Sequence, residues 1–120
     1  MEHHVYIVDD DEAVRDSLRA LFEAHGFVVH DFASAVAFLD RYAPTMRGCL
    51  VLDVNLPGLD GMVVLRCLTA SGSQLPVILM TARSDSAASA SALAAGVIGF
   101  VQKPFVSAQL MSLVDGALRR

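Results

Sequence analysis

The sequence predicts an open, doubly wound α/β fold built on a five-stranded parallel sheet. Five short apolar runs alternate with stretches of helical periodicity, which is the pattern of repeated βα units. Several of these runs are apolar on both faces, as strands are when helices cover both sides of a parallel sheet. Five strands are too few to close an eight-stranded barrel, so we expect the sheet to be open.

The first half of the chain accounts for three strands and two helices. Residues 5–8 are apolar on both faces and predict a central strand. Residues 12–25 place their large apolar side chains on one helical face, and a glycine follows that is suited to end the helix. Residues 27–30 predict the second strand, and Ser34 can cap a short helix that must end before the next proline. Residues 49–52 predict a third strand, again apolar on both faces.

The second half adds two strands and three helices. A loop with proline and glycine leads into a helix that ends near Gly72, and residues 77–80 predict the fourth strand. Residues 85–95 are mostly alanine and serine, so the predicted helix buries little apolar area and should be loosely held. Residues 98–101 predict the fifth strand, and Ser107 opens the last helix.

Composition limits the class of protein. The 120 residues, 54% of them hydrophobic, suffice for the core of one domain, which we expect to span residues 1–120. The net charge of -4 argues against direct contact with nucleic acid. No apolar run approaches the ~20 residues of a membrane helix, and the N-terminus lacks the pattern of a secretory signal. We therefore expect a cytoplasmic protein.

Cysteine and histidine often bind metals, but neither residue type is expected to do so here. Cys49 and Cys67 are expected to be small buried thiols of a reduced protein, since a chain with a good core needs no disulfide scaffold. The four histidines do not show the spacing of a compact metal site, so we expect them to be surface residues.

Candidate functional residues follow four of the predicted strands. Asp9 and Asp10 follow the first strand, Asp53 follows the third, Thr81 follows the fourth, and Lys103 follows the fifth. In open α/β sheets, ligand sites lie at the carboxyl ends of the strands. In the flavodoxin-like strand order 2-1-3-4-5, the first and third strands are neighbours, so the three carboxylates should share one pocket.

The chemistry of this set favours a phosphoryl group carried on a carboxylate. Carboxylates so close together repel one another unless a proton or a cation joins them. Mg²⁺ prefers oxygen ligands and commonly takes one or two carboxylates. Lys103, the only lysine of the chain, adds a compact positive charge, and Thr81 adds a hydroxyl donor. An aspartate can act as a nucleophile and form an aspartyl phosphate, while its neighbours supply positioning and charge neutralisation.

The chain resembles the receiver domain of bacterial two-component response regulators over nearly its full length, from Val5 to about Leu118. The resemblance is carried by the pair Asp9-Asp10, the segment Asp53-Val54-Asn55-Leu56-Pro57-Gly58-Leu59-Asp60-Gly61, the pair Thr81-Ala82 and the segment Lys103-Pro104-Phe105. The segments around Thr81 and Lys103 are similar to those of receivers placed ahead of a helix-turn-helix output domain, such as the nitrogen-fixation regulators.

The resemblance implies a role for each residue of the pocket. Asp53 is the expected phosphoacceptor, which takes a phosphoryl group from a histidine kinase. Mg²⁺, or Mn²⁺ in its place, is expected on Asp10, Asp53 and the backbone carbonyl of Asn55, with Asp9 helping through water or orientation. Lys103 is expected to pair with Asp53 and then with the phosphoryl oxygens.

The resemblance also implies how the signal leaves the pocket. Thr81 is expected to move and donate a hydrogen bond to the phosphoryl group, and the small Ala82 gives that group room. Phe100 is the expected switch aromatic, which turns inward as Thr81 moves. The Lys103-Pro104 bond is expected to be cis, as it usually is in this family.

These implications add up to a signalling switch rather than an enzyme with a separate substrate, with only self-phosphorylation and slow self-dephosphorylation as its chemistry. Its expected partners are a histidine kinase, an output domain or partner protein that controls transcription, and a second phosphorylated copy of the chain. The readout is expected on the predicted fourth helix, the fifth strand and the last helix, without contact with nucleic acid or membrane.

Three other functions compete with this interpretation. A phosphohydrolase of the haloacid-dehalogenase type needs Asp-x-Asp, whereas this chain has Asp53-Val54-Asn55. A flavodoxin-like FMN binder needs a phosphate-binding loop after the first strand, where this chain places acidic residues that would repel a phosphate. A receiver-shaped module that binds partners without phosphate remains as the alternative.

Overall fold

The computed structural model describes residues 2–54, 61–73, 75–81 and 97–119. The elements in chain order are β1 (His4–Val8), α1 (Glu12–Ala24), β2 (Val28–Phe32), α2 (Ala35–Arg41), β3 (Cys49–Asp53), α3 (Gly61–Ala70), β4 (Val77–Thr81), β5 (Val97–Gln102) and α5 (Ser107–Leu118). The helix predicted over residues 85–95 lies outside the described residues. None of the described helices is long and apolar enough to span a membrane.

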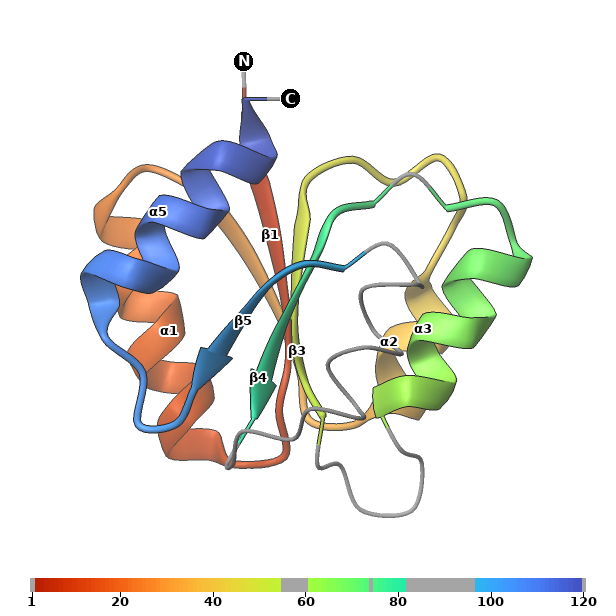
Figure 1. Ribbon diagram of the computed structural model, residues 1–120, viewed down its shortest axis with the longest axis horizontal. Coiled ribbons are helices and arrows are strands. Elements are labelled where there is room, and N and C mark those ends of the chain that lie inside the picture. The colour runs from red at the N-terminus through yellow and green to blue at the C-terminus, as the bar shows by residue number, and fades with distance from the viewer. Residues whose placement is uncertain (1, 55–60, 74, 82–96, 120) are drawn as a thin grey trace.

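The five strands form one parallel sheet in the order β2-β1-β3-β4-β5, which confirms the predicted fold class and strand order. Figure 1 shows α1 and α5 on one side of this sheet and α2 and α3 on the other. The sheet is therefore wound in both directions from its centre, and β1 and β3 meet at the point where the winding reverses.

Alternate residues of the central strands supply two separate cores. Val5 and Ile7 of β1 pack in the cluster that contains α1 and α5, whereas Tyr6 and Val8 pack in the cluster that contains α2 and α3. All five residues of β3 are buried. Full burial of an aliphatic side chain stabilises the fold by about 1.5–3 kcal/mol, so a strand that is apolar on both faces is held from both sides. This holds the strand ends, which carry the polar residues, in fixed positions.

Side-chain caps fix where the first two helices begin. The Asp11 carboxylate accepts a hydrogen bond from the backbone N–H of Ala13, and the Ser34 hydroxyl accepts one from Ala37, as predicted for Ser34. α5 begins at Ser107 but has no side-chain cap, since Val106 precedes it.

The second strand runs two residues further than predicted. It extends to Phe32 because Asp31, which looks like the end of the strand, is held by Arg19 of α1 at 3.3 Å. An aspartate whose charge is paired with an arginine can lie within an edge strand, so the strand continues past it.

Two expectations about isolated side chains are wrong. Cys49 is buried as predicted, but Cys67 is exposed, because Leu65 and Leu68 occupy the core-facing side of α3. The histidines are not all separate surface residues either, since His4 and His30 are half-buried and lie in contact.

The two thiols should therefore differ sharply in reactivity. Burial raises the pKa of Cys49 to about 12, so this thiol stays protonated and shielded near neutral pH. We expect a thiol reagent at pH 8 to modify one cysteine in the folded protein and both in denaturant, with peptide mapping placing the first label on Cys67. Equally fast labelling of both thiols in folded protein would contradict the burial of Cys49.

The turn before β3 should tolerate no side chain at Gly48. Its φ is 131°, and a Cβ there would collide with the backbone carbonyl of His4. Gly72 also has a positive φ, 77°, but a Cβ there would meet open space. We expect Gly72→Ala to lower the free energy of unfolding by about 1 kcal/mol and Gly48→Ala by about 3 kcal/mol or more. Urea unfolding of both variants checks this, and equal losses would contradict it.

Candidate functional site

The predicted acidic residues converge at the carboxyl edge of the sheet. Asp9 follows β1 and Asp53 is the last residue of β3, and these strands are adjacent, with Val8 opposite Leu52. One carboxylate oxygen from each of Asp9, Asp10 and Asp53 lies within 4.8 Å of the others. The structure thus brings Asp53 next to Asp9 and Asp10, which are far from it in the sequence.

The three carboxylates differ in their exposure to solvent. Asp9 is fully buried and Asp53 is 3% exposed, whereas Asp10 is exposed. The carboxylate of Asp9 accepts a hydrogen bond of 2.9 Å from the backbone N–H of Asp11, and its backbone carbonyl accepts one of 2.8 Å from Arg15. The start of α1 therefore fixes Asp9 in place, while Asp10 faces the solvent.

Lys103 bridges the two buried carboxylates. Its ammonium nitrogen lies 2.7 Å from Asp9 Oδ2 and donates a hydrogen bond of 3.0 Å to Asp53 Oδ2. Burial of the ammonium acts to lower the pKa of Lys103, but the hydrogen bonds and charges of both carboxylates outweigh this effect and raise it. The lysine is therefore charged throughout the physiological range.

The backbone places this lysine at the end of the sheet. The backbone N–H of Lys103 donates a hydrogen bond of 2.7 Å to the carbonyl of Thr81, so the chain leaving β5 is tied to the end of β4. The Lys103-Pro104 peptide bond is cis, which confirms that expectation.

The donor set fits a hard divalent cation. Three carboxylates face one ammonium, so the described cluster keeps an excess of negative charge. Within the described part of the chain, the buried Oδ2 of Asp9 touches the lysine but makes no hydrogen bond of normal geometry. Oxygen-only donors of this kind suit Mg²⁺, which is held by a few carboxylates and completes its shell with water.

Of the remaining predicted site residues, the structure describes Thr81 and Phe100. Thr81, half-buried, is the last residue of β4, the strand next to β3. Phe100 lies on β5 opposite Leu79 and is half-buried against the core beneath α2 and α3. Asn55 and Ala82 lie outside the described residues. The roles that the resemblance gives to all of these residues stay predictions.

Two residues that shape the pocket have no predicted role. The Arg15 guanidinium holds the carbonyl of Asp9, although on sequence it looks like part of the solvated face of α1. Gly61 approaches the backbone after β3 so closely that a Cβ would lie 2.7 Å from the carbonyl oxygen of Asp53. The only sequence signal for this contact is a glycine at the end of the loop that follows β3.

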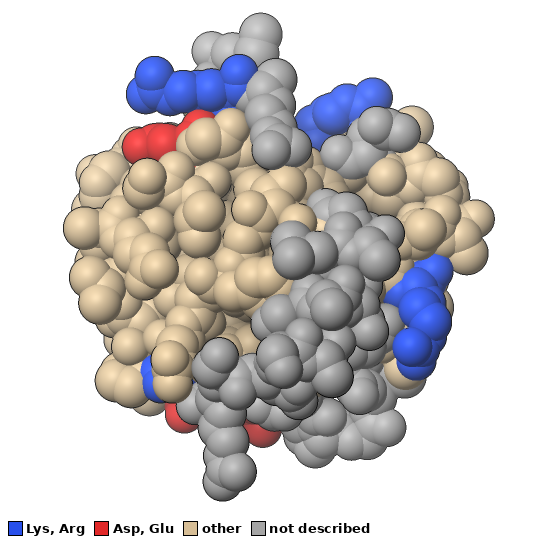
Figure 2. Space-filling view, viewed as in Figure 1, with Lys and Arg blue, Asp and Glu red and all other residues tan. Residues whose placement is uncertain are grey.

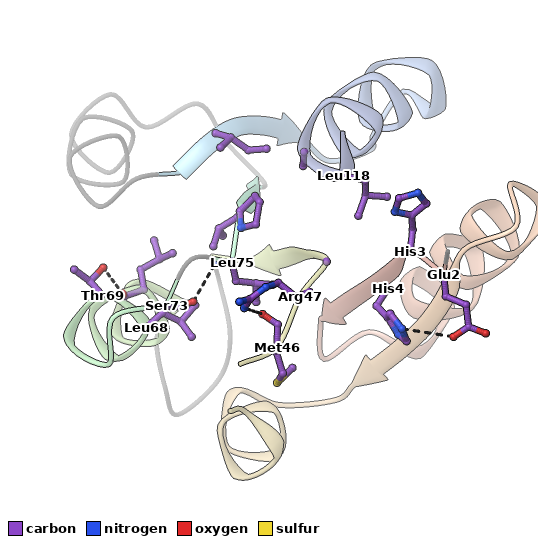
Figure 3. A pocket seen from close by; sticks show the side chains of 16 residues that line it. Glu2, His3, His4, Met46, Arg47, Leu68, Thr69, Ser73, Leu75 and Leu118 are labelled. Carbon is purple, nitrogen blue, oxygen red and sulfur yellow. Dashed lines mark hydrogen bonds and ion pairs between the residues drawn. The ribbon is translucent and has the colours of Figure 1, made fainter. Parts of the chain in front are cut away.

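A hollow of about 640 Å³ lies at the opposite edge of the sheet, not at the acidic cluster. Figure 3 shows residues from the start of β1, from the turn before β3 and from α3 and α5 around it, among them His4, Arg47, Leu68 and Leu118. Among the described residues that line it, none belongs to the predicted site. On the face shown in Figure 2, the described Lys and Arg side chains are scattered around the edge, with no basic patch at its centre.

A buried carboxylate paired with a lysine, beside two further carboxylates at the carboxyl edge of an open parallel sheet, defines a receiver-type signalling domain. Residues 5–115 match the family described as the response regulator receiver domain. The chain belongs to this family, as the sequence motifs predict.

The similar proteins include transcriptional regulators. The chain is 39% identical over 117 residues to the transcriptional regulatory protein FixJ of Bradyrhizobium diazoefficiens, covering 98% of this chain and 57% of that protein. It is 39% identical over 118 residues to the response regulator protein TmoT of Ectopseudomonas mendocina, covering 98% of this chain and 54% of that protein. The chain thus spans little more than half the length of these relatives.

Solved structures agree with this assignment. The response regulator StyR superposes with a TM-score of 0.93 at 37% identity, covering 99% of this chain and 60% of that one. Full-length FixJ from B. japonicum superposes with a TM-score of 0.90 at 39% identity, covering 99% of this chain and 59% of that one.

Removing the positive charge at position 103 should destabilise the fold. Lys103→Met keeps the apolar stem but leaves Asp9 and Asp53 buried without their counter-charge. We expect the free energy of unfolding to fall by about 2–3 kcal/mol in metal-free buffer at neutral pH, because an uncompensated buried charge is costly and the lysine side chain is only 23% exposed.

A second substitution separates this cause from lost packing. Adding Asp53→Asn to Lys103→Met removes one of the stranded charges and should restore part of the loss, as measured by urea unfolding of both single variants and the double variant. Stability of Lys103→Met within about 0.5 kcal/mol of wild type, or additive losses in the double variant, would contradict the proposed charge balance.

Proposed function

We propose that this domain is a phosphoacceptor switch in which Asp53 takes a phosphoryl group from a histidine kinase. The observation that carries the proposal is the pairing of the buried Asp53 carboxylate with the Lys103 ammonium at 3.0 Å, next to Asp9 and Asp10. An aspartate carboxylate can act as a nucleophile, and the Lys103 ammonium already places positive charge where the incoming phosphoryl oxygens would lie.

The transfer needs little covalent chemistry from the protein. A carboxylate oxygen of Asp53 attacks the phosphorus of a phosphohistidine or a small acyl phosphate, and the bond from phosphorus to the leaving group breaks in line with the attack. Lys103 neutralises charge on the phosphoryl oxygens. Asp9, Asp10 and Asp53 would hold Mg²⁺, which supplies further charge neutralisation and fixes the orientation of the phosphoryl group.

Phosphorylation would change the charge balance of the pocket. A phosphoryl group adds about -1.5 to -2 charges on other side chains, and here it would draw Lys103 away from the carboxylates. In the proposed switch, the Thr81 hydroxyl turns to donate to a phosphoryl oxygen and Phe100 moves inward behind it. A two-state equilibrium then shifts, and the changed surface lies on β5, α5 and the helix predicted over residues 85–95.

The relatives suggest what receives the signal. FixJ is a transcriptional regulatory protein, and this chain spans 57% of its length. We infer that the domain acts with an output domain or partner protein that controls transcription, that phosphorylated copies pair, and that it works in the cytoplasm. It has no separate substrate, and its only reaction beyond phosphoryl uptake is slow self-dephosphorylation.

Intact mass spectrometry after incubation with acetyl phosphate tests the proposal. We expect the wild-type chain to gain one phosphoryl group in the presence of Mg²⁺, and much less in a chelating buffer. Asp53→Asn should gain none, while Asp10→Asn should keep the phosphoacceptor but require more Mg²⁺.

Failure of wild type to gain a phosphoryl group, with folding verified by circular dichroism, would reject the phosphoacceptor role and favour the phosphate-independent module. A full gain in Asp53→Asn would place the phosphoryl group on another residue.

A further inference from the structure

Two histidines meet across the edge of the sheet, far from the acidic cluster. His4 begins β1 and His30 lies in β2. His4 Nδ1 is 3.0 Å from His30 Nε2, and the two ring planes are 15° from parallel, with centroids 5.3 Å apart. Nitrogens this close on rings whose centres are this far apart mean that the rings meet edge to edge. Each nitrogen points at the other, which is the geometry of an N–H···N hydrogen bond.

This bond restricts how many protons the pair can carry. A neutral imidazole has one N–H donor and one acceptor nitrogen, whereas a protonated imidazole has two donors and no acceptor. The His4–His30 bond therefore forms when the pair is neutral or when one ring is protonated. It cannot form when both rings are protonated, because both facing nitrogens then carry hydrogen and positive charge.

The surroundings add to the cost of the second proton. The Tyr6 ring lies against His30, with centroids 5.1 Å apart and planes 17° from parallel. The pKa of His30 is lowered below its ordinary value. The largest cause is burial, and the positive charges of His4, Arg19 and Arg41 add to it. The Glu2 carboxylate faces the outer nitrogen of His4 at 3.7 Å but is largely exposed (Figure 3). The nearby Asp31 carboxylate is already paired with Arg19.

The pair lies where the sheet is easiest to open. β2 is an edge strand, and β1 is the strand to which it pairs. We propose that His4 and His30 form a pH-sensitive latch that holds β2 against β1 and opens when both imidazoles are protonated. Tyr6, which contacts His30, also packs edge-on against Phe38 of α2, with centroids 6.4 Å apart, so loosening of the latch reaches the helix above it.

The sign of the pH effect follows from proton binding. The unfolded chain binds the His30 proton near the ordinary histidine value of about 6.5, whereas the folded chain binds it only at lower pH. The neutral state of His30 therefore contributes its full stability above about pH 6.5. Its contribution is lost as the pH falls through the interval between the unfolded and folded values, where the folded-to-unfolded ratio drops by up to tenfold per pH unit.

The first test uses the wild-type chain, so it does not depend on the folding of a variant. Titration of the imidazole ¹⁵N signals from pH 8 to pH 5, with a chelator present, should show His30 taking up its proton at lower pH in the folded chain than in the chain unfolded in urea. Equal titration of His30 in folded and unfolded protein would overturn the latch.

The second test measures stability. We expect the urea midpoint of wild type to fall between pH 7.5 and pH 5.5, and to fall much less in His30→Gln, because glutamine can hydrogen-bond but cannot be protonated. His25→Gln is the matched control, since His25 is exposed and its ring nitrogen lies 2.9 Å from the carbonyl of Leu21 on its own helix. It should keep the full wild-type drop. The same drop in His30→Gln as in wild type would overturn the latch.

Discussion

Burial of two carboxylates under a single ammonium is the constraint on which the rest of this structure depends. Asp9 and Asp53 are almost entirely removed from water, and Lys103 contacts both of them. Such an arrangement is stable only when each group is held in place by something other than its own charge. Strands β1 and β3 are packed into the apolar cores on both faces of the sheet, and they fix the carboxylates at their ends. The hydrogen bond from the Lys103 backbone N–H to the Thr81 carbonyl fixes the lysine.

Most of the fold could be predicted because its information is repeated along the chain. Strands apolar on both faces alternate with amphipathic helices, and the parallel order follows from that repetition. The misses concern single residues, one decided by a distant partner and one by which face of its helix is buried. Asp31 looks like a strand end until Arg19 is placed beside it, and Cys67 looks like a core thiol until its neighbours take the inner face of α3.

The candidate site was predictable for a different reason. The carboxyl ends of parallel strands meet at one edge, so Asp9, Asp53 and Lys103 could be grouped without coordinates. What sequence could not supply is the role of the main chain around them. The contact of Gly61 with the Asp53 carbonyl and the bond from Arg15 to the Asp9 carbonyl involve backbone atoms, which every residue type presents alike. The His4–His30 contact likewise depends on strand register, which composition does not reveal.

The histidine pair and the acidic pocket stand at opposite ends of β1, which limits how one can influence the other. From His4 to Asp9 is about 16 Å at ~3.3 Å per residue, twice the Debye length of about 8 Å at physiological salt. Direct electrostatic coupling is therefore weak. A mechanical route does exist, because the backbone N–H of Asp9 donates a hydrogen bond of 3.1 Å to the carbonyl of Phe32 at the end of β2. An effect of the histidine pair on the pocket would then pass along the β1–β2 ladder, and partial opening confined to the His4 end leaves Asp9 in place.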